Sequence, residues 1–191
     1  MKLKDLVVQA RTCRRFQGDQ AVSFSALQEF IDHARLSASA RNKQQLRFVC
    51  ITDKEACSAM NAFVVMGGAL SAEQRATPKQ HPAAFIAIIG PEEMDSFAVM
   101  DVGIAAQTIN LAACEAGLAC CMIGAFQKEK AARLIGLEDG LQIKLILAIG
   151  KADEERRIVP PVNGSLTYYR DENDVHCVPK LPLDTLIIKN I

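Results

Sequence analysis

The sequence predicts an α+β fold in which helices cover both faces of a central mixed sheet. Two apolar runs, 83–90 and 141–150, have the length and bounding residues of strands that are buried on both faces. Between them, residues 97–118 are apolar almost all round, which predicts a helix surrounded by protein. A chain of 191 residues, half of them hydrophobic, can bury one such core. We expect a single domain over 1–191, with a core to residue 150 and a C-terminal extension over 151–191.

Local patterns predict the first elements. Apolar residues recur at helical spacing over 3–10 and again over 25–36, where Ser25 and Gln28 have the spacing of a capping box. The run 47–52 is rich in β-branched and aromatic residues, which favour strands. The chain therefore begins with two helices and a strand.

The same reasoning continues to the end of the core. Asp53 is placed to cap a helix over 54–63, whereas several breakers interrupt 67–82, to which we assign no secondary structure. After the long apolar helix, 120–126 predicts a strand that runs into a glycine turn, and Gly136 stops the helix that follows.

The C-terminal extension is partly apolar but has no helical pattern of its own. The charged turn "RDEND" lies between "LTYY" and "VHCV", which predicts a hairpin with both tyrosines and the turn on its surface. An apolar tail of this length needs a surface to pack against. We expect a second subunit to supply it, and hence a homodimer whose tails pack on the partner.

Composition excludes several classes of protein. Acidic and basic residues balance at 22 each, so nothing indicates a nucleic-acid partner or an acidic membrane surface. No apolar stretch has the length of a membrane span, and the N-terminus lacks the apolar core of a signal peptide, so we expect a cytoplasmic protein. Seven cysteines without C-x-x-C spacing and three scattered histidines predict free thiols and no metal site. Cys120 and Cys121 should face opposite sides of their strand.

The segment "RTCRRF" concentrates positive charge close to the N-terminus. Arg11 and Arg14 are three residues apart, with the Thr12 hydroxyl between them, and guanidinium groups match phosphate oxygens well. The alternative is that cations follow a helix end and complement its dipole, which we assign to Arg15.

Two further stretches could contact a ligand. The run "SASARNKQQLRF", residues 37–48, combines small residues, which permit close approach of the backbone, with amide side chains. In "CMIGAF", Gly124 could expose backbone amides at the end of a strand. An ordinary polar loop and a plain turn are the alternatives.

These stretches together resemble the FMN-dependent nitroreductase family. "RTCRRF" is similar to its R-S-x-R-x-F motif, and "ASARNKQQLRF" to P-S-x-x-N-x-Q-P-W-x-F. "MDVGIAAQTINLAACEAGLACCMIGAF" resembles the family's D-x-G-x-A-x-Q-N-x-x-L-A-A helix and the loop after it. Ala38, Arg41, the pair Gln45-Leu46 and Thr108 depart from the motifs.

The resemblance implies positions for the cofactor. Arg11, Thr12, Arg14 and Lys180 would hold the FMN phosphate. Asp101 would lie near the pyrimidine side of the ring, and a backbone amide near residue 124 would face N5. The residues implied to contact the flavin are Ala38, Ser39, Ala40, Asn42, Gln44, Ile123, Gly124 and Ala125.

The resemblance also implies a reaction. The protein would be an NAD(P)H-dependent flavin oxidoreductase that reduces nitroaromatics, quinones or similar small acceptors by ping-pong hydride transfer, with NADPH or NADH as reductant. No catalytic side chain is expected, because the chemistry takes place at flavin N5. The alternative is a flavin-binding carrier or sensor without turnover. Arg41 would either select anionic substrates or point into solvent.

Overall fold

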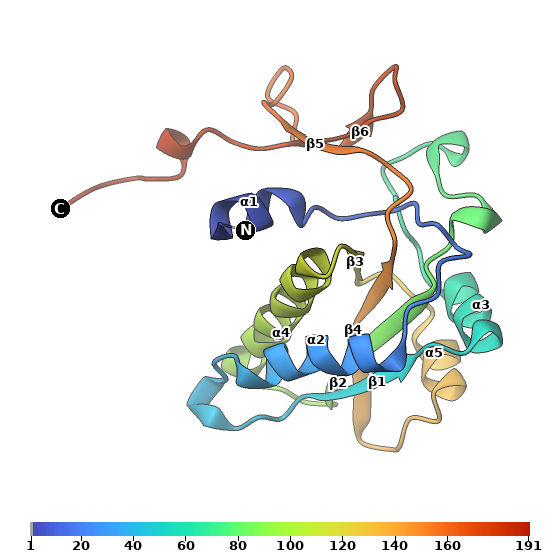
Figure 1. The fold of residues 1–191 in the computed structure, drawn as a ribbon. Helices are drawn as coiled ribbons and strands as arrows, with labels where there is room; N and C mark the ends of the chain where they lie inside the picture. The colour runs from blue at the N-terminus through green and yellow to red at the C-terminus, as the bar shows by residue number, and fades with distance from the viewer. Residues whose placement is uncertain (1) are drawn as a thin grey trace.

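The computed structural model, which describes residues 2–191, is built around a four-stranded sheet with helices on both faces (Figure 1). The strand order is β1 (Arg47–Ile51), β2 (Ala84–Pro91), β4 (Leu141–Gly150), β3 (Ala119–Ile123), and all neighbours pair antiparallel. The helices are α1 (Leu3–Gln9), α2 (Phe24–Leu36), α3 (Lys54–Phe63), α4 (Ser96–Glu115) and α5 (Lys128–Leu134). The predicted α+β class and the predicted core elements are confirmed, although the central sheet is antiparallel throughout rather than mixed.

Two details of the predicted elements change. Ser23, rather than Ser25, caps α2 by accepting a hydrogen bond from the Ala26 amide at 3.2 Å, so the predicted capping box is wrong. The stretch without assigned structure holds two short 3-10 turns, η2 (Ala72–Gln74) and η3 (Pro78–Gln80), each closed by its own capping box.

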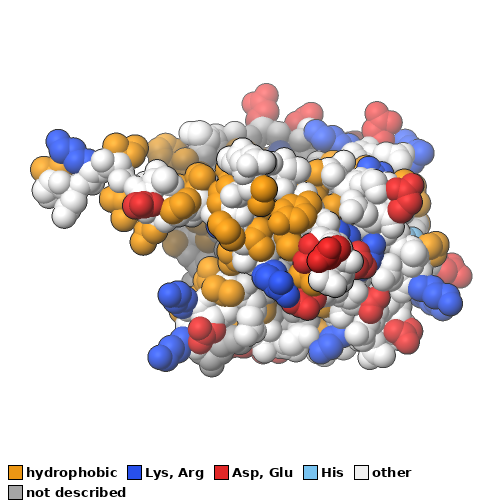
Figure 2. Space-filling view, turned by 90° about the horizontal axis from the view of Figure 1, so that it is seen from above, with side chains coloured by type: hydrophobic (Ala, Val, Ile, Leu, Met, Phe, Trp, Pro, Cys, Tyr) orange, Lys and Arg blue, Asp and Glu red, His pale blue; other side chains and the backbone are white. Residues whose placement is uncertain are grey.

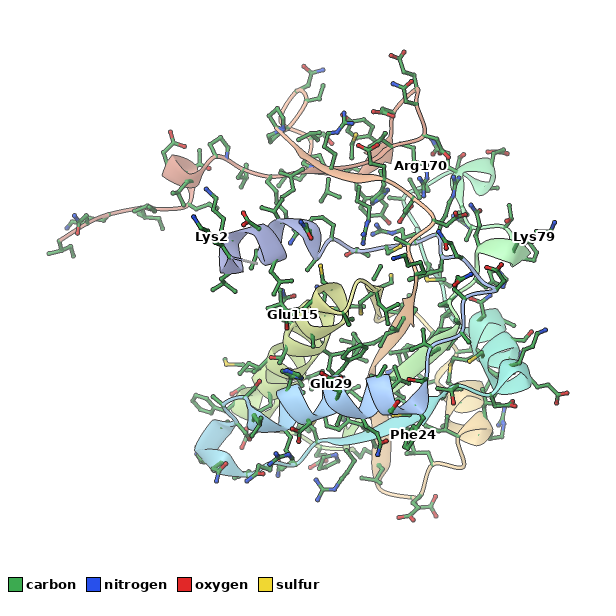
Figure 3. The ribbon with its side chains drawn as sticks, viewed as in Figure 1. Lys2, Phe24, Glu29, Lys79, Glu115 and Arg170 are labelled. Atoms are coloured by element: carbon green, nitrogen blue, oxygen red, sulfur yellow. The ribbon has the colours of Figure 1, made fainter. Side chains whose placement is uncertain are left out.

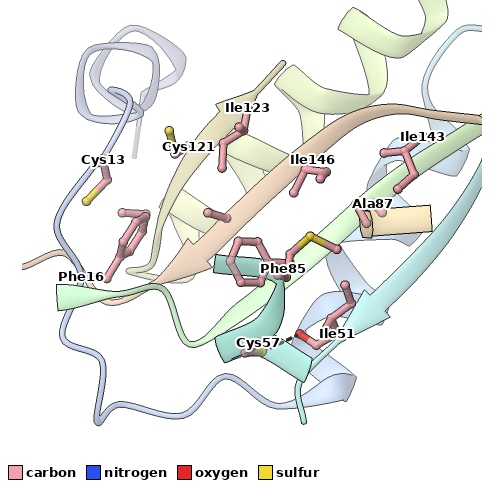
Figure 4. Packing of buried hydrophobic residues seen from close by; sticks show 14 of the residues in the cluster. Cys13, Phe16, Ile51, Cys57, Phe85, Ala87, Cys121, Ile123, Ile143 and Ile146 are labelled. Carbon is pink, nitrogen blue, oxygen red and sulfur yellow. Dashed lines mark hydrogen bonds between the residues drawn. The ribbon is translucent and has the colours of Figure 1, made fainter. Parts of the chain in front are cut away.

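Strand β2 is the centre of the core because both of its faces are covered. Phe85, Ala87 and Ile89 pack on the side of α3 and α5 (Figure 4), whereas Ile86 and Ile88 pack on the side of α2 and α4. The neighbouring thiols of β3 also lie on opposite faces of the sheet. Cys121 packs on the side of α3 and α5, and Cys120 packs on the side of α2 and α4. The expectation that they face opposite ways is confirmed.

Helix α4 is only half covered, so the expectation that protein surrounds it is wrong within one chain. Seven of its residues are buried, but Phe97, Val99, Met100 and Ile104 lie on the surface. By length and composition it is also the one helix within residues 2–191 that could cross a membrane, a test that partly buried core helices of soluble proteins pass as well. These side chains give α4 an exposed apolar side that nothing in residues 2–191 covers.

The C-terminal extension forms a second, smaller sheet above the core (Figure 1). Its strands are β5 (Arg156–Val159), β7 (His176–Pro179) and β6 (Tyr169–Arg170), in that order, and β5 pairs with β7 in parallel. The predicted hairpin is confirmed as β6 and β7, and mixed strand pairing occurs in this sheet rather than in the central one. Beyond it, η4 (Leu183–Thr185) and the last residues project away from the body of the molecule (Figures 1 and 2).

Candidate functional site

The arginine segment, residues 10–16, crosses the end of the central sheet beneath the extension (Figure 1). Cys13 and Phe16 are both fully buried, and the Cys13 amide donates to the Cys120 carbonyl at 3.0 Å. Burial, and after it the charge of Glu154, raises the pKa of the Cys13 thiol, which keeps it protonated and inert. These two anchors fix the segment, and Arg14 and Arg15 bind the extension.

The helix-end role expected of Arg15 belongs to Arg11. Arg11 donates from Nη2 to the Val7 carbonyl at 2.6 Å, so it is this arginine that caps the last turn of α1. Arg15 is paired with Asp174 and donates to the Gln74 carbonyl at 2.8 Å. The helix-end role assigned to Arg15 is therefore wrong.

Arg14 lies in a pocket of aromatic rings supplied by the extension. Its guanidinium carbon is 3.9 Å from the centroid of the Tyr168 ring, and its Nη1 is 2.6 Å from Nε2 of His176. The rings of Tyr168 and His176 are themselves 5.4 Å apart. The arginine is thereby held in one orientation without a carboxylate partner.

His176 is fully buried at the centre of this contact. Burial, and after it the positive charge of Arg14, lowers the pKa of His176 to about 4. Because Arg14 donates to Nε2, the neutral ring carries its proton on Nδ1, which is buried without a hydrogen-bond partner.

The hairpin turn does more than cover the surface. Arg170 and Glu154 form an ion pair in which each side chain is 1% exposed, and Arg170 also donates from Nε to the Gln74 carbonyl at 3.0 Å. Arg170, labelled in Figure 3, lies in the extension near the short turns of residues 72–80. Asp174 from the same turn binds Arg15. The expectation that the charged turn lies on the surface is wrong for Arg170, which is buried, whereas Asp174 is exposed as expected and also binds Arg15.

The second motif forms a tight loop around η1 (Ala40–Asn42). Arg41, Asn42 and Gln44 all have φ near +50°, a left-handed conformation that is costly for residues other than glycine. The carboxylate of Asp101, buried at the start of α4, offsets this cost. It accepts hydrogen bonds from Ser39 Oγ at 2.7 Å and from the Ala40 amide at 2.9 Å.

A groove of about 710 Å³ adjoins this loop between α2, β1 and α4. Ala38, Ser39 and Gln44 line it. Arg41 is not among the residues that line the groove. Its side chain is 65% exposed, and its Nη1 lies 3.9 Å from the carboxylate of Asp95. This position supports the interpretation that Arg41 points into solvent.

The third motif follows β3. Ile123, the last residue of β3, is 2% exposed as a whole residue and packs in the core, so it offers no surface to a ligand within residues 2–191, whereas Gly124 and Ala125 are exposed. The Ala125 carbonyl accepts from the Val65 amide at 2.9 Å, and open space surrounds Gly124 where a side chain would stand.

The structure separates two of the predicted groups of site residues. Arg11, Thr12 and Arg14 lie beneath the small sheet, whose strand β7 ends beside the exposed Lys180. The loop 38–44 lies at the opposite end of the molecule (Figure 1). A single chain therefore does not bring the two groups together. Sequence reasoning missed Arg156, Tyr168 and His176, because no motif covers the extension.

Comparison with known protein families identifies the class to which this α+β fold belongs. The model of the Nitroreductase family matches residues 7–151, which includes all three motifs. The chain belongs to the nitroreductase family.

Solved structures share the fold. A nitroreductase family protein from Streptococcus pneumoniae has a TM-score of 0.73 at 16% identity, over 99% of this chain and all of the other. An FMN-dependent nitroreductase from Clostridium difficile has a TM-score of 0.67 at 21% identity, over 81% and 90% of the two chains. A gut-bacterial enone reductase of fatty acid saturation metabolism has a TM-score of 0.66 at 18% identity, over 81% and 90%. No curated protein matches the sequence.

Proposed function

We propose that the protein is an FMN-dependent oxidoreductase that uses NADH or NADPH to reduce small acceptors such as nitroaromatics or quinones. The observation that carries the proposal is the arginine segment, in which Arg11 and Arg14 are half-buried and lie within 4.0 Å of no carboxylate in residues 2–191. A half-buried cation without a counter-ion favours an anionic ligand.

The residues present fit the phosphate of FMN. Arg11 Nε is buried without a hydrogen-bond partner, which leaves a donor free for an anion. Arg14 is held in place by Tyr168, and Thr12, between the two arginines in the chain, is half-buried. Lys180, exposed at the end of β7, adds a further cation in this proposal.

FMN, when bound, supplies hydride transfer from the nicotinamide to the acceptor in a ping-pong sequence. The chain's own residues then have three tasks: to hold the phosphate, to position the ring and to shape the acceptor pocket. The exposed residues Gly124 and Ala125 offer backbone hydrogen-bonding groups to the ring edge, and the buried Ile123 anchors the end of the strand that carries them. No side chain serves as acid or base in this proposal.

We further propose a homodimer in the cytoplasm. The exposed apolar side of α4 and the projecting tail, in which Ile188 is 99% exposed, both need a cover. Figure 2 shows apolar side chains gathered along the tail and beside it. Loop 38–44 of one subunit would then complete the site at the arginine segment of its partner.

One spectrum of the purified protein tests the proposal. Flavin absorption that bleaches rapidly on anaerobic mixing with NADH or NADPH, and returns on addition of a nitroaromatic or quinone, supports the enzyme. A yellow protein indifferent to both nucleotides would be a carrier or sensor instead. A protein that neither contains FMN nor takes it up would contradict both functions.

A further inference from the structure

Three arginines without an acidic partner in residues 2–191 occur where the arginine segment contacts the small sheet. Arg15, Arg157 and Arg170 each pair with a carboxylate, but Arg11, Arg14 and Arg156 lie within 4.0 Å of none in residues 2–191. All three unpaired arginines are half-buried. Concentrating unpaired charge at partly dry positions is unfavourable unless an anion binds there.

Arg156 lies at the junction of the other two. Its Nη1 donates to the Arg11 carbonyl at 2.7 Å, directly before Thr12 in the chain. On β5 it is the register partner of His176 on β7, and His176 is the residue that Arg14 contacts. One bond to a carbonyl leaves the rest of the guanidinium fork available.

The geometry points to Arg156 as a third phosphate-binding residue, supplied by the extension rather than by the N-terminal motif. The inference rests on the proposed function, since the phosphate is that of FMN. The fork of Arg156 and those of Arg11 and Arg14 bind the same anion, and the small sheet places Arg156 over the segment that carries them. The extension is thus part of the cofactor site.

The competing explanation is that Arg156 only ties the extension to the arginine segment through the Arg11 carbonyl. If Arg156 only links the extension to the arginine segment, its loss would lower the affinity of the site for every ligand by the same factor. A phosphate contact affects FMN but not riboflavin, which has the same ring and ribityl chain without the phosphate. The ratio of the two affinities therefore separates the explanations.

The test compares Arg156→Ala with Arg157→Ala in the full-length chain. Arg157 is the next residue on β5, is largely exposed and pairs with Glu155, so it is a matched control. The apoprotein of each variant is titrated with FMN and with riboflavin, and flavin fluorescence gives both dissociation constants. We expect Arg156→Ala to lower the affinity for FMN about 10- to 100-fold and to leave the affinity for riboflavin unchanged. The Arg157→Ala control should bind both flavins as the wild type does.

Each outcome decides the inference. If Arg156→Ala weakens both flavins equally, or neither, while the wild-type protein binds FMN, Arg156 does not bind phosphate and the proposed function stands. If the wild-type protein binds no FMN, the proposed function fails. Thermal unfolding in inorganic phosphate then tests the anion site alone. A larger rise in unfolding temperature for the wild type than for Arg156→Ala would support an anion site at Arg156. Equal rises for the two proteins would overturn it.

Discussion

Glu154 and Arg170 form an ion pair that the fold removes from water, with each side chain 1% exposed. The pair joins the residues that follow β4 to strand β6, and Glu154 also accepts from the Arg14 amide at 2.5 Å. It therefore fastens the small sheet to both the core and the arginine segment.

Glu154→Gln should destabilise the protein strongly, because the change leaves Arg170 buried without its counter-charge. Loss of one partner of a buried pair costs about 3–5 kcal/mol. Urea unfolding measures the loss. The control is Glu155→Gln, since Glu155 is exposed and forms only a surface pair with Arg157. Equal stability of the two variants would show that the pair contributes nothing.

His176 should make stability depend on pH. Its folded-state pKa of about 4 lies below the ordinary value of 6.5, so the unfolded chain binds the proton more tightly. This contribution to stability is complete above pH 6.5 and is lost as the pH falls from 6.5 towards 4, at no more than about 1.4 kcal/mol per pH unit. Denaturant unfolding of the wild type and of His176→Gln at several pH values checks it. Parallel profiles would contradict the prediction.

Asp101→Asn should loosen loop 38–44. The amide cannot accept from both Ser39 and the Ala40 backbone as the carboxylate does, and hydrogen bonds to a charged group contribute about 1.5–3 kcal/mol. Hydrogen exchange should accelerate at the Ala40 and Gln44 amides, while α3 stays protected. Asp95→Asn is the control, because asparagine still caps α4.

Arg14→Ala should weaken FMN binding by about 1.5–3 kcal/mol, the usual value for a hydrogen bond to a charged group. Arg15→Ala should have little effect on FMN, because its guanidinium is occupied by Asp174 and Gln74. Titration of each variant with FMN gives its dissociation constant, and the two constants are compared with that of the wild type. Equal losses would count against the phosphate assignment.

Removal of residues 181–191 should convert the dimer into a monomer or an aggregate. The deleted tail carries apolar side chains that are exposed in the described residues 2–191, among them Leu186 and Ile188. Light scattering gives the molecular mass. Ile188→Asp in the full-length chain is the milder test, and an undisturbed dimer in both cases would remove the tail from the interface.

The core elements were predictable because their patterns are local and repeated. The all-apolar run of β2 and the capping position of Asp53 specify their structures directly, and both are confirmed. The contacts of the extension were not predictable in this way. Arg170 belongs to a charged hairpin, so its neighbours in sequence predict exposure. It is buried because the fold brings it against Glu154, which is remote from it in secondary structure. The same holds for Arg156 and His176.

The distance between the arginine segment and loop 38–44 has a genetic consequence (Figure 1). In the proposed dimer, each site takes its arginines from one polypeptide and its loop from the other. A chain carrying Arg14→Ala and a chain carrying Asp101→Asn would then rescue each other when they assemble together. Their mixed dimer combines both lesions in one site and leaves the other intact, so two defective alleles complement within a single gene.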